Sequence, residues 1–284
     1  MAVSFQIAET RGMFIAATSV EQSNQSSQKM VDMKIAEIWR YPVKSMLGEQ
    51  VDQANVGPGG IQGDRSWAVV DAESGVSLSA KRYPDLLHCR AWTSDGKVTI
   101  KLPDGVENPA GSAEVARGLS DLLGRQVTTR SAEATETIRH EFPTAVTEGE
   151  GKPFLVEPET EAFFDRVPLQ LLTTGTLTEL QRLLPASMIH HARFRPNFLV
   201  ETNEIGFVEN DWVNKDVTLG SLKCQVYEDT RRCIMVALGQ GDLPRDTEVI
   251  RTILKQNEGR AGVALKTLDS GILRCGAKVE VLIA

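Results

Sequence analysis

Short segments with strand-like patterning, separated by turns that contain glycine or proline, recur along most of the 284-residue chain. In residues 97–102 (KVTIKL), Val98, Ile100 and Leu102 alternate with polar residues and so share one face of a half-buried strand. Further strands are predicted within residues 34–45, 66–70, 193–201, 212–228 and 277–284. This pattern predicts an α+β chain that is predominantly β and is built from barrel-like sheets with a few helices.

Three segments have helical periodicity. Residues 112–124 place their leucines and a valine on one helical face, and Gly124 is a stop signal. Thr176 and Glu179 have the spacing of a capping box for a second helix, and residues 247–259 form an amphipathic third helix. The chain has no internal repeat, GxGxxG motif or P-loop, so a dinucleotide-binding or ATPase fold has no support.

Two structured lobes are predicted after a weakly ordered tail. The tail covers residues 1–33, and no basic segment precedes its apolar stretch GMFIAATSV. We therefore expect no signal peptide and a cytoplasmic protein. An N-terminal β-barrel-like domain is predicted over residues 34–130 and a second β-barrel domain over residues 161–284. The polar residues 131–160 between them are predicted to be a linker or mobile loop.

Charge and cysteine usage exclude several classes of protein. The net charge is −7, which disfavours a protein that coats DNA or an anionic membrane. No stretch approaches the ~18 consecutive apolar residues of a membrane span. We therefore expect neither a nucleic-acid nor a membrane partner. The four cysteines include no CxxC pair and the four histidines lack metal-site spacing, so a zinc or histidine metal site is not expected.

Cationic and polar residues gather at the ends of predicted strands in this acidic chain. The stretches are YPVKS with Lys44 and Ser45, GDRSW with Asp64 and Arg65, RFRPN with Arg193, Arg195 and Asn197, and TRRC with Arg231, Arg232 and Cys233, and SAKRYP adds Lys81 and Arg82. Arginine makes bidentate contacts to phosphate and lysine acts as a point charge. The stretches together therefore predict a local anion-binding pocket.

Cys233 itself has two interpretations. A free cysteine is often a small buried hydrophobe, in which case Cys233 begins a core strand and the arginines are solvated. Cationic neighbours also stabilise a thiolate, which is the form that acts as nucleophile and metal ligand. The stretch alone does not decide between them.

Several stretches resemble a known family. IAEIWRYPVKSMLGEQV followed by GDRSWAVVD resembles the N-terminal β-barrel domain that precedes a MOSC domain, named after the C-terminal domain of molybdenum cofactor sulfurase. FRPNFLVE, TRRC and the closing strand resemble the MOSC domain itself. The resemblance runs from about Lys34 to Ala284, and the architecture is similar to that of the mitochondrial amidoxime-reducing component and its bacterial relatives.

The resemblance implies a bound molybdenum cofactor (molybdopterin) and roles for single residues. Cys233 matches the family cysteine whose thiolate ligates molybdenum, and Asp165 of FFDRVP matches an acidic position near the cofactor. A helix or turn cap is the alternative role for Asp165. Contacts to the cofactor are implied for Lys44, Ser45, Arg65, Arg193, Arg195, Asn197 and Arg232. Among these, Arg65 and Arg195 would hold the pterin and its terminal phosphate.

The resemblance implies a reductase of N- or S-oxygenated small molecules. The sequence has no flavin, haem or iron–sulfur motif, so an external electron-donor protein is expected. After Cys233 the chain reads IMVALGQGDLPRD, where the amidoxime reductases carry a TTVD-type run. Two alternatives therefore stay open: a sulfur carrier that uses a persulfide on Cys233, and a binding protein that kept the fold without the chemistry.

Overall fold

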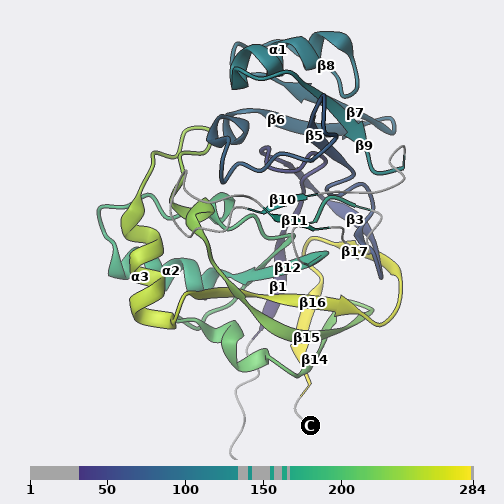
Figure 1. Ribbon diagram of the computed structural model, residues 1–284. Coiled ribbons are helices and arrows are strands. Elements are labelled where there is room, and N and C mark those ends of the chain that lie inside the picture. The colour runs from purple at the N-terminus through teal and green to yellow at the C-terminus, as the bar shows by residue number, and fades with distance from the viewer. Residues whose placement is uncertain (1–31, 134–139, 143–153, 157–161, 165–166, 283–284) are drawn as a thin grey trace, which may run out of the picture. The chain divides into compact units, whose positions relative to one another are not determined.

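Seven strands close into a β-barrel in the computed structural model, which describes residues 32–133, 140–142, 154–156, 162–164 and 167–282 (Figure 1). In ring order they are β1 (Met33–Arg40), β13 (Phe198–Glu201), β12 (Leu169–Thr173), β16 (Arg260–Thr267), β15 (Leu222–Arg231), β14 (Asp216–Leu219) and β18 (Lys278–Val281), which returns to β1. All neighbours are antiparallel except β12 and β13. The predicted β-rich fold with a barrel and a few helices is confirmed.

The barrel interior is filled by the inward-facing half of each alternating strand. On β15, Leu222, Cys224 and Val226 are buried, whereas Lys223 and Gln225 between them are exposed. The buried side chains join those of the other barrel strands in one apolar core. Full burial of such a side chain contributes about 1.5–3 kcal/mol. A register slip of one residue would turn this face outward, so the alternation fixes the register.

Smaller sheets lie outside the barrel ring. The pairs and triples are β5 (Trp67–Asp71) with β9 (Val127–Ser131), β6 (Arg90–Ser94) with β7 (Lys97–Lys101) and β8 (Glu107–Pro109), and β3 (Gln53–Gly57) with β4 (Gly60–Ile61) and β17 (Gly271–Arg274). Strand β2 (Glu49–Val51) extends β1. Helix α1 (Ala113–Leu123) is capped by the Ser112 side chain and ends at Gly124, whose φ of 61° suits glycine. Its apolar face joins a second core beneath these strands.

Strand pairing crosses the predicted division of the chain. β1 comes from the predicted N-terminal domain, yet it closes the barrel between β13 and β18. β17, from the C-terminal part, pairs with β3. The predicted linker contains β10 (His140–Phe142) paired antiparallel with β11 (Phe154–Val156), and its other residues beyond Glu133 lie outside the described part. Residues 31–284 thus form one compact unit.

The second helix begins earlier than the capping-box spacing predicts. Helix α2 (Thr174–Leu183) is capped by Thr173, whose side chain accepts a hydrogen bond from the backbone N of Thr176. The prediction of Thr176 as the cap is wrong, because its hydroxyl lies inside the helix and donates to the buried Glu209 carboxylate at 2.7 Å. Burial raises the pKa of Glu209. The Gly262 backbone N also donates to Glu209, so this carboxylate ties α2 to β16.

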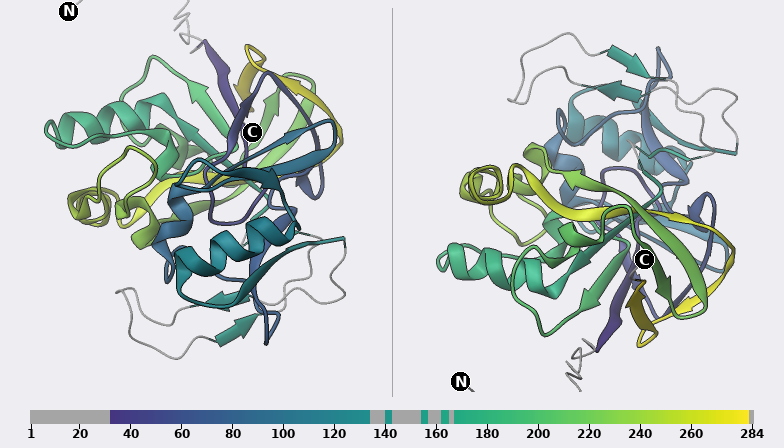
Figure 2. Two further views of the ribbon diagram at one scale, coloured as in Figure 1. Left: turned by 90° about the horizontal axis from the view of Figure 1, so that it is seen from above. Right: turned by 90° about the horizontal axis from the view of Figure 1, so that it is seen from below.

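Helix α3 (Thr247–Asn257) packs beside α2 outside the barrel (Figures 1 and 2). Short 3-10 turns connect the remaining elements: η1 (Pro84–His88), η2 (His191–Arg193), η3 (Val208–Trp212) and η4 (Ile234–Ala237). Among the described residues, no helix combines the length and apolar composition that crossing a membrane requires.

The η2 turn is anchored to β1 through His191. The His191 ring lies 4.8 Å from the Trp39 ring and 4.1 Å from the His190 ring, measured between centroids. Its Nδ1 is 3.5 Å from the Glu37 carboxylate, and its buried Nε2 has no hydrogen-bond partner in the described part of the chain. Burial and the neighbouring His190 lower the pKa of His191 to about 4, although the Glu37 carboxylate acts to raise it. His191 is therefore neutral at pH 7.

We predict that His191 makes the fold acid-sensitive. An unfolded histidine has a pKa of about 6.5, so below that pH the unfolded state binds more protons than the folded state. The free energy of unfolding should fall by about 2 kcal/mol between pH 7.5 and pH 5 from this residue alone. Urea unfolding at both pH values should show a smaller fall for His191→Gln than for wild type. The exposed His88→Gln is the control, and equal pH dependence of all three proteins would contradict the assignment.

Candidate functional site

A cleft of about 310 Å³ collects side chains from six separate stretches of the sequence. Of the predicted site residues, its lining contains Lys44, Ser45, Arg65, Arg193, Arg195, Arg232 and Cys233. Asn197 is not in this lining, and Asp165 lies outside the described residues. Lys81 is in the lining, whereas Arg82 is not.

Unusual backbone conformations present several of these side chains to the cleft. Ser45, Arg65 and Arg195 have φ values of 67°, 47° and 54°, in the left-handed region that residues other than glycine seldom adopt. They make up half of the six non-glycine residues with positive φ in the described part of the chain. Such strain costs about 1–3 kcal/mol per residue and gathers at functional sites. Its concentration at one cleft therefore supports a functional role for these loops.

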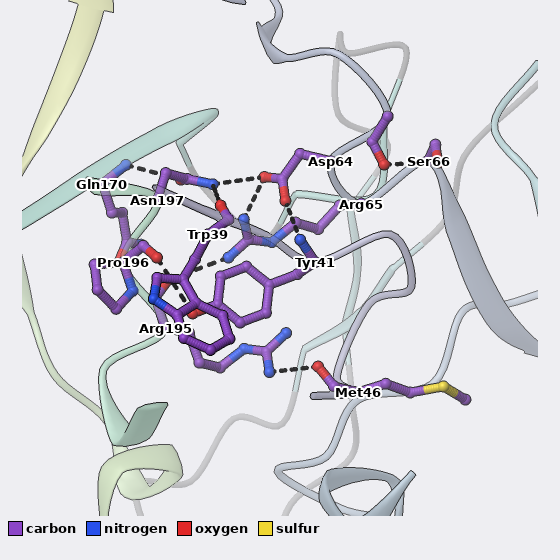
Figure 3. A network of polar contacts seen from close by, with 11 residues as sticks. Trp39, Tyr41, Met46, Asp64, Arg65, Ser66, Gln170, Arg195, Pro196 and Asn197 are labelled. Atoms are coloured by element: carbon purple, nitrogen blue, oxygen red, sulfur yellow. Dashed lines mark hydrogen bonds and ion pairs between the residues drawn. The ribbon is translucent and has the colours of Figure 1, made fainter. Parts of the chain in front are cut away.

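Tyr41 holds two of the guanidinium groups together. The guanidinium carbons of Arg65 and Arg195 each lie 4.4 Å from the Tyr41 ring centroid, and Figure 3 shows them on either side of the ring in that view. Arg65 donates to the backbone O of Arg195 at 3.3 Å, and Arg195 donates to the backbone O of Met46 at 2.6 Å. Burial raises the pKa of Tyr41 to about 12, so the phenol stays neutral between its cations.

Asn197 makes hydrogen bonds that position residues of the site. Its Nδ2 donates to the Asp64 carboxylate at 3.0 Å, and its Oδ1 accepts a hydrogen bond from the Gln170 backbone N at 3.1 Å (Figure 3). The Asp64 carboxylate also pairs with Arg65 and accepts a hydrogen bond from the backbone N of Tyr41 at 2.7 Å. The amide of Asn197 is thus engaged within the protein. The structure gives it a positioning role, and its predicted contact with a cofactor stays a prediction.

Arg193 has a similar internal role, although it belongs to the cleft lining. Its guanidinium donates to the backbone oxygens of Met188, Val236, Leu238 and Pro244. The bonds to Val236 and Leu238 hold η4, the turn that directly follows Cys233, and its C-cap. Because its donors face carbonyl oxygens, Arg193 shapes the cleft more than it offers charge to a ligand.

Arg232 retains an unused donor next to the cysteine. Its side chain donates to the backbone oxygens of Ala261 at 2.6 Å and Phe194 at 2.9 Å, and to the Gln170 side chain at 3.2 Å. Its buried Nη2 has no partner within the described chain. Burial lowers the pKa of Arg232 to about 10, so the group stays cationic at pH 7.

Thr230 adds a second unused polar group to the same wall. Its Oγ1 is buried, and among the described residues nothing hydrogen-bonds to it. Buried polar groups in native proteins nearly always have a partner, so a ligand bound in the cleft would satisfy both Thr230 and Arg232. The sequence alone assigns Thr230 no role, because a threonine before two arginines forms no recognisable motif.

Cys233 differs from the other three cysteines in its surroundings. Burial raises the pKa of the Cys89 and Cys224 thiols to about 12, and it also raises the pKa of Cys275. Those three are therefore protonated thiols at neutral pH. Cys233 is partly exposed, lies in the cleft and adjoins the cationic Arg232. Cys233 is therefore not a buried core residue, and its role as a ligand or nucleophile stays a prediction.

The cleft is strongly cationic in a protein of net charge −7. Among its described lining residues, the cationic side chains are Lys44, Lys81, Arg65, Arg193, Arg195, Arg231 and Arg232, and the acidic ones are Glu228 and Asp229. Such local focusing of positive charge attracts anions. The predicted anion pocket is therefore supported by the way the strands bring its stretches together.

Comparison with known proteins agrees with this arrangement. The model of the MOSC N-terminal beta barrel domain matches residues 32–143, and that of the MOSC domain matches residues 158–280. The chain is a MOSC-domain protein. Both family segments contribute to the cleft, because Lys44 and Arg65 come from the first and Arg195 and Cys233 from the second.

Curated relatives of this MOSC protein are distant. Molybdenum cofactor sulfurase of Danio rerio is 24% identical over 87% of this chain, which spans only 33% of that protein. Mitochondrial amidoxime reducing component 2 of Homo sapiens is 26% identical over 72% of the chain and 66% of its own length. Among solved structures, the YUAD protein from Bacillus subtilis covers 89% of this chain and 98% of its own, with 13% identity and a TM-score of 0.42.

We predict that Arg195→Ala weakens anion binding in the cleft. Loss of a charge-assisted contact costs about 1.5–3 kcal/mol, which raises a dissociation constant about tenfold to a hundredfold. Isothermal titration with inorganic pyrophosphate at low ionic strength measures the effect. The control is Arg251→Ala on α3, whose side chain is 70% exposed and pairs with Glu248. Unfolding curves check that Arg195→Ala is folded. If both folded variants bind pyrophosphate with the same dissociation constant, the anion binds elsewhere.

Proposed function

We propose that this protein binds a molybdenum cofactor in the cleft and reduces small N- or S-oxygenated compounds with electrons from a separate donor protein. The supporting observation is that Cys233 shares one cleft with cationic groups from four distant stretches. The names of two relatives, molybdenum cofactor sulfurase and mitochondrial amidoxime reducing component, agree with this cofactor and with an N-oxygenated substrate.

The donor groups present fit such a cofactor. No cluster of three or more His, Cys, Asp or Glu side chains suited to a metal occurs in the described part of the chain. A metal at Cys233 would therefore need further ligands from the cofactor itself, and a thiolate suits a soft metal centre. The unpartnered Nη2 of Arg232 and Oγ1 of Thr230 would gain hydrogen-bond partners when an anionic group with many oxygens is bound.

Residues of the cleft have separate tasks in this proposal. Lys44, Arg65 and Arg195 would bind the anionic end of the cofactor, and the Cys233 thiolate would ligate the metal. When bound, the cofactor supplies the redox chemistry, so the protein contributes binding, orientation and exclusion of water. Phe163 and Phe164, which are 2% and 5% exposed, would exclude water from one wall.

Electrons would come from outside the chain. The sequence holds no flavin, haem or iron–sulfur motif that could store them. A small electron-transfer protein is thus the proposed partner, and a small oxygenated molecule is the proposed substrate. The cytoplasmic localisation inferred from the sequence stays a prediction.

We predict that Cys233 is required for retention of molybdenum. Wild type, Cys233→Ala and Cys275→Ala are purified from a host that makes the cofactor, and molybdenum is measured by mass spectrometry. Cys233→Ala should retain less than about a tenth of the wild-type metal, because loss of a metal ligand costs more than the 10- to 100-fold typical of an outer-shell partner. Cys275→Ala should retain it, because Cys275 is not in the cleft lining and its thiol donates to the Val51 carbonyl.

Two results would contradict this assignment. Equal molybdenum in wild type and Cys233→Ala, with both variants folded by circular dichroism, would exclude Cys233 as the ligand. A molybdenum-free wild type whose intact mass reveals a reducible extra sulfur on Cys233 would instead establish the sulfur carrier.

We further predict that loaded protein reduces an amidoxime or a hydroxylamine with reduced viologen and remains inactive with NADH alone. Viologen can replace the donor protein, whereas the sequence has no nicotinamide-binding motif. Product formation is measured by chromatography, with Cys233→Ala as the inactive control. Absence of turnover by molybdenum-loaded protein with N-oxides, S-oxides and hydroxylamines would rule out the reductase.

A further inference from the structure

One cation of the cleft, Arg231, has no hydrogen-bond or ion-pair partner among the described residues. Arg231 is the last residue of β15, and its side chain is exposed at the cleft two positions before Cys233. Within the described chain, no hydrogen bond or ion pair engages its guanidinium. The guanidinium of Arg65, by contrast, pairs with Asp64, and that of Arg195 donates to a backbone carbonyl.

Asp229, which lies two residues before Arg231, is paired with another arginine. Arg231 lies directly across from Arg260 of β16 in the strand register. The Arg260 guanidinium is 3.6 Å from Asp229 and 3.3 Å from Glu258. Asp229, the acid closest in sequence to Arg231, thus faces Arg260. The charge of Arg231 consequently remains available to a ligand in the cleft.

The same cleft offers apolar surface. Its lining includes the apolar residues Phe163, Phe164, Val167, Phe194 and Val236. A ligand with an apolar body could contact this surface while an anionic group meets a guanidinium at the rim. Arg231 suits that second contact, because an arginine fork binds a carboxylate through two parallel hydrogen bonds. Both contacts would be made in the cleft that contains Cys233.

We propose that Arg231 selects substrates by binding a carboxylate, so that the preferred substrates are apolar N- or S-oxygenated acids. This inference rests on the proposed reductase function. It further specifies that the substrate carries a negative charge. Arg231 is partly solvated, so the selectivity is moderate. We expect about a tenfold preference for a carboxylate-bearing compound over its neutral analogue, and a smaller preference at high salt.

The test compares 4-carboxybenzamidoxime with benzamidoxime on molybdenum-loaded protein. Two quantities are measured for each compound: kcat/KM with reduced viologen, and the dissociation constant by calorimetry without reductant. The proteins are wild type, Arg231→Ala, Arg231→Lys and the surface control Arg251→Ala. In Arg231→Ala, the acid-to-neutral ratio should fall about tenfold in both measurements. Arg231→Lys should recover part of it, because it keeps the charge and loses the fork, and Arg251→Ala should match wild type.

Each outcome bears on one proposal. An acid-to-neutral ratio that is the same in wild type and Arg231→Ala overturns the selectivity. Loss of molybdenum from Arg231→Ala also overturns it, because Arg231 would then hold the cofactor. If wild type reduces neither compound yet binds the acid more tightly through Arg231, the reductase fails and the carboxylate subsite stands.

Discussion

The cleft depends on holding several guanidinium groups close together in one partly buried space. Like charges repel, and the repulsion grows as water is excluded. The chain counters it with the neutral Tyr41 ring, which contacts both Arg65 and Arg195, and with the Asp64 carboxylate. Backbone carbonyls accept the remaining hydrogen bonds of Arg193 and of most of the Arg232 side chain. These partners make the cluster possible and still leave a positive cleft.

Closure of the barrel brings the cluster together. β1 runs antiparallel to β13, so the end of β1 lies beside the start of β13, with Ile38 opposite Phe198. Tyr41 follows the first of these strands and Arg195 precedes the second, which explains why two residues far apart in sequence stack on each other. Arg232 then links the end of β15 to this region through Gln170 and the Phe194 carbonyl.

The cations of the cleft differ in how many of their hydrogen-bond donors are engaged by other residues of the protein. Arg193 is occupied by carbonyl oxygens, Arg232 retains one buried donor, and Arg231 is engaged by no described residue. A single cleft can thus combine structural support, a contact to a buried anion and a contact at the rim. This gradation gives Cys233 a cationic surrounding, which would suit either a metal ligand or a persulfide.

The sequence by itself determined the β-rich architecture, because period-two patterning specifies which face of each strand is buried, as in Val98 and Ile100. It also determined which residue types could form the site, since Lys44, Arg195 and Cys233 lie in recognisable motifs. Only the tertiary structure decided how those residues divide their work. Asn197 and Arg193 form hydrogen bonds within the protein, whereas Thr230 and Arg231 have no partner among the described residues. The sequence could not indicate this, because hydrogen-bond partners are set by contacts between strands that are distant in sequence.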